Sequence, residues 1–166
     1  MWVYLLIALI VVLDQVSKIL VKLYLPSSVG VSVIPRLFSF RYHENSGAAW
    51  GMLSDHRWVF MIISSVAILV ILAYLIYIHL RNQKTDVLFR ISLAFFCGGG
   101  IGNMVDRIRL GYVIDFLRFD FIDFPIFNVA DSFITVGACL MILYLIIETL
   151  RDIKKKRGGE HKHENP

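Results

Sequence analysis

The sequence predicts a mainly α-helical integral membrane protein with four transmembrane helices. A small extracytoplasmic β-rich cradle and an interfacial loop or short helix are expected beside them. Two observations support this fold class. Hydrophobic residues make up 57% of the 166 residues, against about 45–50% in a typical soluble domain. The mean hydropathy is +0.68, and the apolar residues are concentrated in four blocks, each near the roughly 20 residues that cross a bilayer.

The four apolar blocks cover residues 2–25, 58–80, 87–105 and 128–150. The first block lacks the basic start and the small-residue cleavage site of a signal peptide, so we expect it to be a retained span. We therefore predict one membrane-embedded domain over residues 1–156. A basic polar cytoplasmic tail over residues 157–166 is expected to follow it.

The distribution of basic residues predicts that both termini are cytoplasmic. Arg81, Lys84 and Arg90 flank the connection between the second and third blocks, and a basic cluster follows the fourth. Scattered basic residues on the outer side oppose this orientation, namely Lys22, Arg36, Arg41, Arg57, Arg107, Arg109 and Arg118. The basic cluster directly follows an apolar run. It therefore fits topology or lipid headgroups, and no nucleic-acid partner is expected.

The two outer connections contain many β-branched and aromatic residues. Residues 29–42 combine such residues with Pro35 as a break, which predicts strands. Residues 112–127 include Phe119, Phe121 and Phe124, which predicts a segment at the membrane interface. We expect the aromatic parts of these connections, residues 31–42 and 116–124, to form a half-submerged cradle and a gating flap.

Polar residues inside or at the edges of the spans are costly and converge at one predicted depth. They are Asp14, Lys18, Asn103, Asp106, Arg107, Asn128 and Asp131. Structural roles explain several of them: Asp14 and Lys18 as a neutralising i,i+4 pair, and Asn128 as a helix N-cap. Asp106 could likewise be held ionised by the neighbouring Arg107. These readings stay open beside functional ones.

Asp115 and Asp131 are the carboxylates left without an adjacent partner in the sequence. Two close aspartates in a low-dielectric site share a proton near neutral pH. One can then take a proton from water while the other donates to a carbonyl oxygen, which hydrolyses an amide. Spacing alone does not show that the two residues meet.

Other chemistries fit the residues less well. A serine–histidine mechanism lacks a G-x-S-x-G elbow, and His43, His56 and His79 fall in predicted loops or at a span end. Arg107 would oppose a cation, so neither a metal nor another cofactor is expected, and Cys97 and Cys139 are expected to pack as small hydrophobes. The rival reading is a non-catalytic proton-linked membrane carrier or lipid-binding scaffold that uses the same carboxylates.

Five segments together resemble the lipoprotein signal peptidases, the type II signal peptidase family, over nearly the whole chain. They read D-Q-V-S-K at 14–18, N-S-G-A-A-W at 45–50, G-G-I-G-N-M-V-D-R at 99–107, V-I-D-F at 113–116 and F-N-V-A-D-S at 127–132. The resemblance implies an intramembrane aspartic endopeptidase of the bacterial cell membrane. Such enzymes remove signal peptides from prolipoproteins by cleaving on the amino side of a diacylglyceryl-modified cysteine. Their active site faces the outer leaflet.

The resemblance also assigns roles to individual residues. It implies Asp115 and Asp131 as the catalytic pair. It implies that the substrate is bound by Asn45, Arg107 and Asn128. The supporting residues that it implies are Asp14, Lys18, Gly47, Asn103, Asp106 and Ala130. Small residues such as Gly47 and Ala130 would let an extended peptide approach closely. The expected partners are diacylglyceryl-modified prolipoproteins and membrane lipids, and we expect a monomer.

Overall fold

The computed structural model describes residues 1–25, 30–47 and 57–160, and it contains four helices and one small sheet in that part of the chain. The elements are α1 (Trp2–Tyr24), β1 (Val31–Ile34), β2 (Phe38–Asn45), α2 (Arg57–Leu80), α3 (Val87–Leu110), β3 (Val113–Phe119) and α4 (Val129–Glu160). The predicted mainly helical fold is confirmed.

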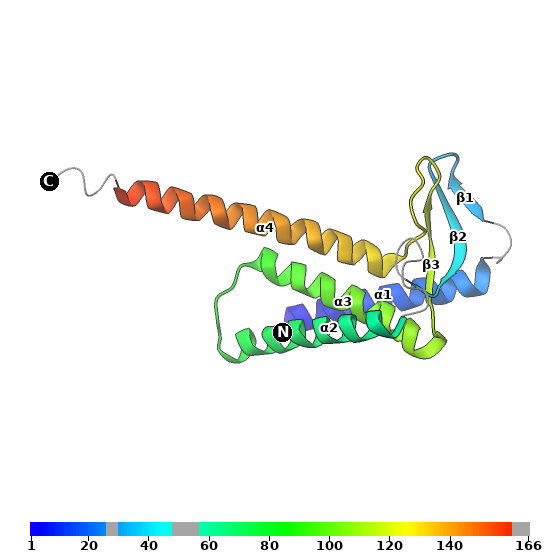
Figure 1. Ribbon diagram of the computed structural model, residues 1–166, viewed down its shortest axis with the longest axis horizontal. Coiled ribbons are helices and arrows are strands. Elements are labelled where there is room, and N and C mark those ends of the chain that lie inside the picture. The colour runs from blue at the N-terminus through cyan, green and yellow to red at the C-terminus, as the bar shows by residue number, and fades with distance from the viewer. Residues whose placement is uncertain (26–29, 48–56, 161–166) are drawn as a thin grey trace.

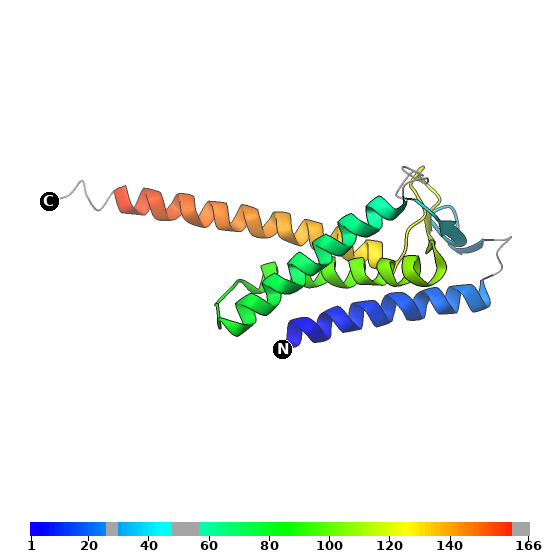
Figure 2. The ribbon, with the colours of Figure 1, turned by 60° about the horizontal axis from the view of Figure 1, so that its bottom comes forward.

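Each of the four helices contains a stretch long and apolar enough to cross a membrane: Trp2–Tyr24, Met61–Leu80, Val87–Leu110 and Val129–Lys156. The helices run alternately in opposite directions, so the N-terminus and the end of α4 lie at one end of the molecule and the sheet lies at the other (Figures 1 and 2). The predicted spans are correct in number and approximate position. The last two helices extend five and ten residues beyond their predicted ends, because polar residues continue the helix past the apolar block.

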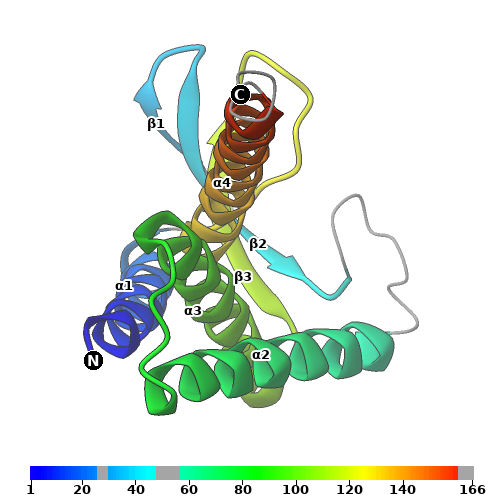
Figure 3. The ribbon, with the colours of Figure 1, turned by 90° about the vertical axis from the view of Figure 1, so that its left-hand side faces the viewer.

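Helix α3 is central and packs against α1, α2 and α4 (Figure 3). Its glycines allow this close packing. A Cβ built on Gly98 would lie 2.8 Å from the Ile10 side chain of α1, and one on Gly99 would lie 2.5 Å from the Ala130 carbonyl oxygen of α4. Small residues that let helix backbones approach closely are typical of packed transmembrane helices.

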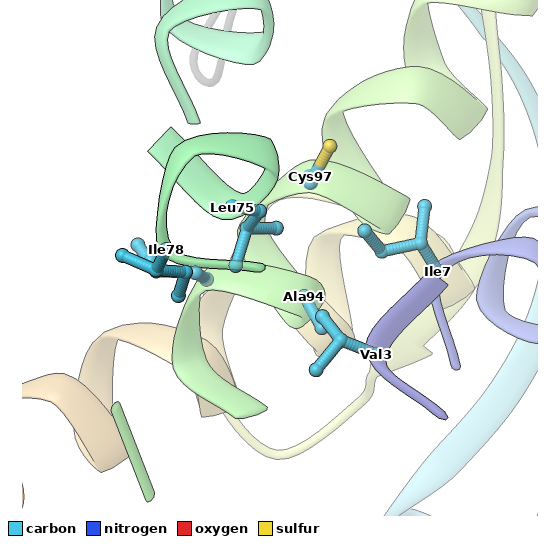
Figure 4. Close-up of a cluster of buried hydrophobic side chains, with 7 residues drawn as sticks. Val3, Ile7, Leu75, Ile78, Ala94 and Cys97 are labelled. Carbon is cyan, nitrogen blue, oxygen red and sulfur yellow. The ribbon is translucent and has the colours of Figure 1, made fainter. Parts of the chain in front are cut away.

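An apolar cluster holds the helices together at the end far from the sheet. Val3 and Ile7 of α1 meet Leu75 and Ile78 of α2 against the Ala94 and Cys97 side of α3 (Figure 4). On α1 the buried positions continue toward the sheet as Ile10, Asp14 and Lys18, one helix face throughout. The buried stripe therefore changes from apolar to charged as it approaches the sheet.

The sheet has the order β1-β2-β3, and both strand pairs are antiparallel. Strands were predicted in residues 29–42, but β2 continues to Asn45, so His43 is in a strand opposite Asp115 and not in a loop. The segment predicted as an interfacial loop or short helix contributes a third strand, β3, followed by an irregular loop over residues 120–128. Aromatic rings line the sheet and this loop: Phe119 contacts Phe38 and Phe127, and Phe116 contacts Phe40.

The turn between α3 and β3 fixes where the third strand starts. Gly111 ends α3 with φ 85°, a left-handed conformation that glycine adopts without steric cost, and its N–H donates to the Arg107 carbonyl. The chain then reverses into β3, whose first four residues are buried. The polar side chain of Asp115, the third residue of β3, is consequently held against the polar ends of the helices.

Candidate active site

Strand β3 positions Asp115 inside the protein, with 1% of its surface exposed. Its Oδ2 accepts a hydrogen bond from Asn45 Nδ2 at 2.8 Å, and its Oδ1 accepts one from Asn128 Nδ2 at 2.7 Å. Asn45 is the last residue of β2, and its own Oδ1 accepts from the Gly47 N–H at 3.0 Å. That contact fixes the direction of the Asn45 amide, so its NH₂ group faces Asp115.

The first turn of α4 positions Asp131 through a reciprocal cap. Asn128 Oδ1 accepts from the Asp131 N–H at 2.9 Å, and Asp131 Oδ2 accepts from the Asn128 N–H at 3.2 Å. This is the geometry of a capping box, here built from Asn and Asp. The other carboxylate oxygen of Asp131, Oδ1, accepts a hydrogen bond from Asn103 Nδ2 of α3 at 2.8 Å.

Asn128 joins the two aspartates. Its Oδ1 caps α4 at Asp131, while its Nδ2 donates to Asp115 and also to Asn103 Oδ1 at 3.0 Å. The sequence left open whether Asn128 is an N-cap or part of a functional site, and one side chain does both. All four carboxylate oxygens of Asp115 and Asp131 therefore accept hydrogen bonds from oriented donors.

Both aspartates line one pocket of about 570 Å³ beside the sheet. Its polar wall also includes Asn45, Gly47, Asn103 and Arg107. Its apolar wall comes from the end of β3, the loop before α4 and the start of α4: Phe119, Phe124, Pro125, Ile126, Phe127, Ile134 and Val136. The pocket thus places two carboxylates opposite a surface suited to lipid or apolar side chains.

The environment of Asp115 favours its protonated form. Burial raises the pKa of Asp115 to about 7, and the nearby charge of Asp131 adds to the rise. The hydrogen bonds from Asn45 and Asn128 oppose it. A carboxyl group that holds a proton near neutral pH beside a second carboxylate is able to act as a general acid.

A buried ionic cluster lies behind the pair. Lys18 of α1 contacts Asp14 Oδ2 and Asp106 Oδ2, each at 2.8 Å, and all three side chains are at most 4% exposed. Arg107 was expected to hold Asp106 ionised, and the structure adds Lys18, which reaches Asp106 from the facing helix and forms the ion pair with it. Arg107 lines the pocket and interacts electrostatically with Asp131, Asp115 and Asp106.

Asp14 also supports the start of α4. Its Oδ1 accepts from the Ala130 N–H at 3.0 Å, so a side chain from α1 satisfies one of the free amides in the first turn of α4. This contact agrees with the structural reading of the first-span motif. Lys18 is 1% exposed, which also agrees with a structural role.

Two further residues of this region were not identified as site residues from the sequence. Gln15 Nε2 donates to Asp14 Oδ2, Asp106 Oδ1 and the Gly102 carbonyl, at 3.0–3.2 Å. Gly102 leaves room for Asp14, since a Cβ there would lie 2.6 Å from Asp14 Oδ2. The sequence signal that could have identified Gln15 was its position next to Asp14. Ala48, Ala49 and His56 lie outside the described residues, and within those residues no group of three His, Cys, Asp or Glu side chains forms a metal site.

Comparison with known proteins identifies the family. Residues 6–147 match the family model described as signal peptidase (SPase) II. The chain is 38% identical to the lipoprotein signal peptidase of Brevibacillus brevis, over 89% of this chain and 97% of that one. It is 40% identical to that of Enterococcus faecalis, over 93% and 94%.

A solved structure gives the same answer for the fold. It is described as a bacterial membrane enzyme determined by the in meso method at 2.3 Å resolution, and it matches with a TM-score of 0.78 and 31% identity over 89% of this chain and 88% of that one. The fold, the helices long enough to span a membrane and the family match agree with one another. The chain belongs to the lipoprotein signal peptidase (signal peptidase II) family, and it is a multi-pass membrane peptidase that removes signal peptides from prolipoproteins.

Proposed function

We propose that Asp115 and Asp131 are the catalytic pair of this aspartic endopeptidase. Asp131, at the start of α4, acts as the general base and takes a proton from the attacking water. Asp115, protonated on β3, donates to the carbonyl oxygen of the scissile bond as the tetrahedral intermediate forms. The observation that supports this proposal best is that both carboxyl groups line one pocket. Asn128 links the two groups by hydrogen bonds, and burial raises the pKa of Asp115 to about 7.

The pocket suggests which residues hold the substrate. Arg107 and Asn45 line it with polar groups, and the Arg107 guanidinium has donors suited to backbone carbonyls that water does not reach. Asn128 was expected to bind substrate as well. Because it is 0% exposed and its donors already serve Asp115 and Asn103, we assign it the orientation of the pair instead.

The substrate that fits is a prolipoprotein cut on the amino side of its diacylglyceryl-modified cysteine. An extended peptide can pass Gly47, which lines the pocket. Ala130 was expected to share this role, but it is 0% exposed and its N–H donates to Asp14, so it supports the start of α4 instead. The apolar wall from Phe119 to Val136 would then accept the acyl chains, as the resemblance implies. Membrane lipids would occupy the same surface when no substrate is bound.

We also propose the orientation in the membrane. Arg81, Lys84 and Arg90 lie at the end of the bundle opposite the sheet, which is also the end where α4 finishes with its basic cluster. Both termini are then cytoplasmic, and the pocket opens near the outer leaflet. A monomer over residues 1–156 is sufficient for this arrangement, because both aspartates and the pocket come from one chain. Residues 157–160 continue α4, and the remainder of the proposed tail lies outside the described residues.

A cleavage assay in detergent–lipid micelles tests the pair and the substrate together. The substrates are a diacylglyceryl-modified prolipoprotein and its unlipidated precursor, separated by gel mobility. Wild type is compared with Asp115→Asn, Asp131→Asn and, as a matched control, Asp120→Asn, whose side chain pairs with Ser39 and Arg118 away from the pocket. Thermal melts verify that each variant is folded.

We expect wild type and Asp120→Asn to cleave the lipidated substrate alone, and both pair variants to be folded and inactive. Cleavage that survives Asp115→Asn or Asp131→Asn would move the chemistry to other residues. Equal cleavage of the unlipidated precursor would refute the proposed substrate specificity. A folded wild type that cleaves neither substrate would contradict the peptidase assignment and favour a carrier or scaffold.

A further inference from the structure

Lys18 is a buried cation that the proposed mechanism does not use directly. Its ammonium group contacts Asp14 and Asp106 at 2.8 Å and Asn103 Oδ1 at 3.0 Å. It is not among the described residues that line the pocket, so it does not touch the substrate in the proposed arrangement. Two carboxylates already neutralise it. The contact with Asn103 therefore needs a separate explanation.

That contact determines which way the Asn103 amide points. An ammonium group can only donate hydrogen bonds, so the Asn103 oxygen, not its nitrogen, must face Lys18. Asn128 Nδ2 donates to the same oxygen at 3.0 Å, which adds to the preference. Asn103 Nδ2 is then directed to Asp131 Oδ1 at 2.8 Å. With the amide reversed, an NH₂ group would face the ammonium and a carbonyl oxygen would face the carboxylate.

This orientation separates the roles of the two aspartates. Asp131 receives a donor whose amide is polarised by the charge of Lys18, and chains of hydrogen bonds strengthen one another in a low-dielectric interior. Asp131 also lies in the first turn of α4, where the positive end of the helix favours an anion. Asp115 lies on a strand, without a helix N-terminus.

We propose that Lys18 is a positioning residue for catalysis, which acts through Asn103 to keep Asp131 as the proton-accepting member of the pair. This inference rests on the proposed function. The charged groups around this path come from three neighbouring elements. Asp14 on α1 and Asp106 on α3 face Lys18, and Lys18 also interacts electrostatically with Asp115 on β3. Asp115 and Arg107 on α3 interact electrostatically with Asp131.

Steady-state cleavage kinetics as a function of pH test the inference. For Lys18→Met we expect kcat to fall roughly ten- to a hundred-fold, the range for residues that orient a reactive group from behind. KM should be unchanged, and the acid limb of the kcat profile should move to higher pH, since Lys18 no longer orients the Asn103 amide that donates to Asp131. Lys18→Arg, which keeps the charge and the donors, should recover most of the wild-type kcat and pH profile. The matched control is Ser17→Ala, whose hydroxyl bonds only within α1 at the Asp14 carbonyl.

A double-mutant cycle with Asn103→Ala shows whether Lys18 acts through Asn103. We expect Lys18→Met to shift the profile in the wild-type background and to add little shift once Asn103 is gone. Full additivity of the two shifts would overturn the proposed path. A purely structural role for Lys18 predicts fewer folded molecules and a lower melting temperature, with an unshifted profile for the enzyme that remains.

Lys18→Met leaves two buried carboxylates without their cation, which destabilises the fold. A second, charge-balanced variant therefore repeats the test. Lys18→Met combined with Asp106→Asn removes one charge of each sign, and it is compared with Asp106→Asn alone. The same shift of the acid limb is expected, and its absence would refute the inference. Asp115→Asn and Asp131→Asn test the catalytic pair separately. If both are inactive while Lys18→Met leaves the acid limb of the kcat profile unshifted, this inference is rejected and the proposed function is retained.

Discussion

At the scale of single residues, the site depends on amides with a fixed direction. Asn45 is oriented by the Gly47 N–H, Asn103 by Lys18, and Asn128 by the Asp131 N–H. Each of these contacts occupies the amide oxygen and leaves the NH₂ group for a carboxylate. A buried polar network of this kind is favourable when every member is satisfied, and the described part of the chain has no buried side-chain nitrogen or oxygen without a partner.

The raised pKa of Asp115 predicts how stability depends on pH. Its value rises from 3.8 to about 7 on folding, so the folded state holds a proton that the unfolded chain releases between these values. The stabilisation is fully present below about pH 4 and is lost as pH rises to about 7, by at most about 1.4 kcal/mol per pH unit. Melts of wild type, Asp115→Asn and Asp120→Asn from pH 4 to 8 measure this. Asp115→Asn should lack the decline that wild type and Asp120→Asn share. Parallel curves for all three would contradict the assigned proton.

Gly102 predicts a second effect at this scale. Gly102→Ala places a Cβ 2.6 Å from a carboxylate oxygen of Asp14 that is held by Lys18 and Gln15, so the neighbour cannot move aside freely. We expect a loss of about 1–3 kcal/mol in stability together with reduced cleavage. Gly100→Ala is the matched control, because its Cβ would meet the movable Ile68 side chain at 3.1 Å. Thermal melts that show equal losses for both variants would argue against a rigid ionic cluster.

At the scale of elements, the start of α4 is where structure and chemistry share the same atoms. Three of its first groups are satisfied by specific partners: the Ala130 N–H by Asp14, the Asp131 N–H by Asn128, and the Asp131 carboxylate by Asn103. Helix α3 faces the same point with Asn103 and Asp106, and β3 faces it with Asp115. The helix cap therefore fixes the distance between the pair.

The two functions of Asn128 can be separated by substitution. Asn128→Ser keeps an oxygen able to cap α4 but lacks the Nδ2 donor to Asp115, whereas Asn128→Ala lacks both. We expect Ser to be about 1 kcal/mol more stable than Ala, and both to lose most of the cleavage activity. Melting temperature and kcat of the two variants measure this. A Ser variant with wild-type activity would show that the donor to Asp115 is dispensable.

Much of the fold follows from sequence patterns that act locally. Hydropathy over about 20 residues predicts each span, and β-branched residues predict strands before α2. The pairing of Asp115 with Asp131 came from the family resemblance, since spacing left it open. The ion pair between Asp106 and Lys18 depends on how α1 packs on α3. Gln15 joins residues 87 and 91 positions away, and no local pattern encodes such contacts.

At the scale of the whole molecule, the apolar end of the bundle stabilises the fold and the polar end contains the candidate site. The cluster around Val3, Leu75 and Cys97 fastens the helices together far from the sheet. The ionic cluster, the pair and the pocket occupy the opposite end, where β3 and the loop before α4 expose aromatic and aliphatic side chains such as Phe121 and Ile122. We expect this end to lie in the lipid headgroup region, since substrate and lipid must reach the pocket sideways.

Spin labels test the position of this end in a bilayer. Phe121 is 59% exposed, whereas Phe119 contacts Phe38, Phe124 and Phe127 and lines the pocket, so Phe121 is the better reporter. A label on Phe121→Cys, in a Cys139→Ser background, should collide more with oxygen than with a polar nickel chelate. A label on Asn82→Cys, in the polar turn between α2 and α3, should show the reverse. Equal accessibility at both positions would place the loop in water.

The most direct test of the central claim is a structure of the protein with a lipidated peptide that carries a hydroxyl-bearing tetrahedral isostere in place of the scissile amide. The account predicts that the hydroxyl oxygen lies within hydrogen-bond distance of both Asp115 and Asp131, with the acyl chains along the wall from Phe119 to Val136. It also predicts that Asp115→Asn and Asp131→Asn each weaken binding of the isostere. A hydroxyl bound away from the two carboxyl groups, with affinity unchanged in both variants, would contradict the assignment of the catalytic pair.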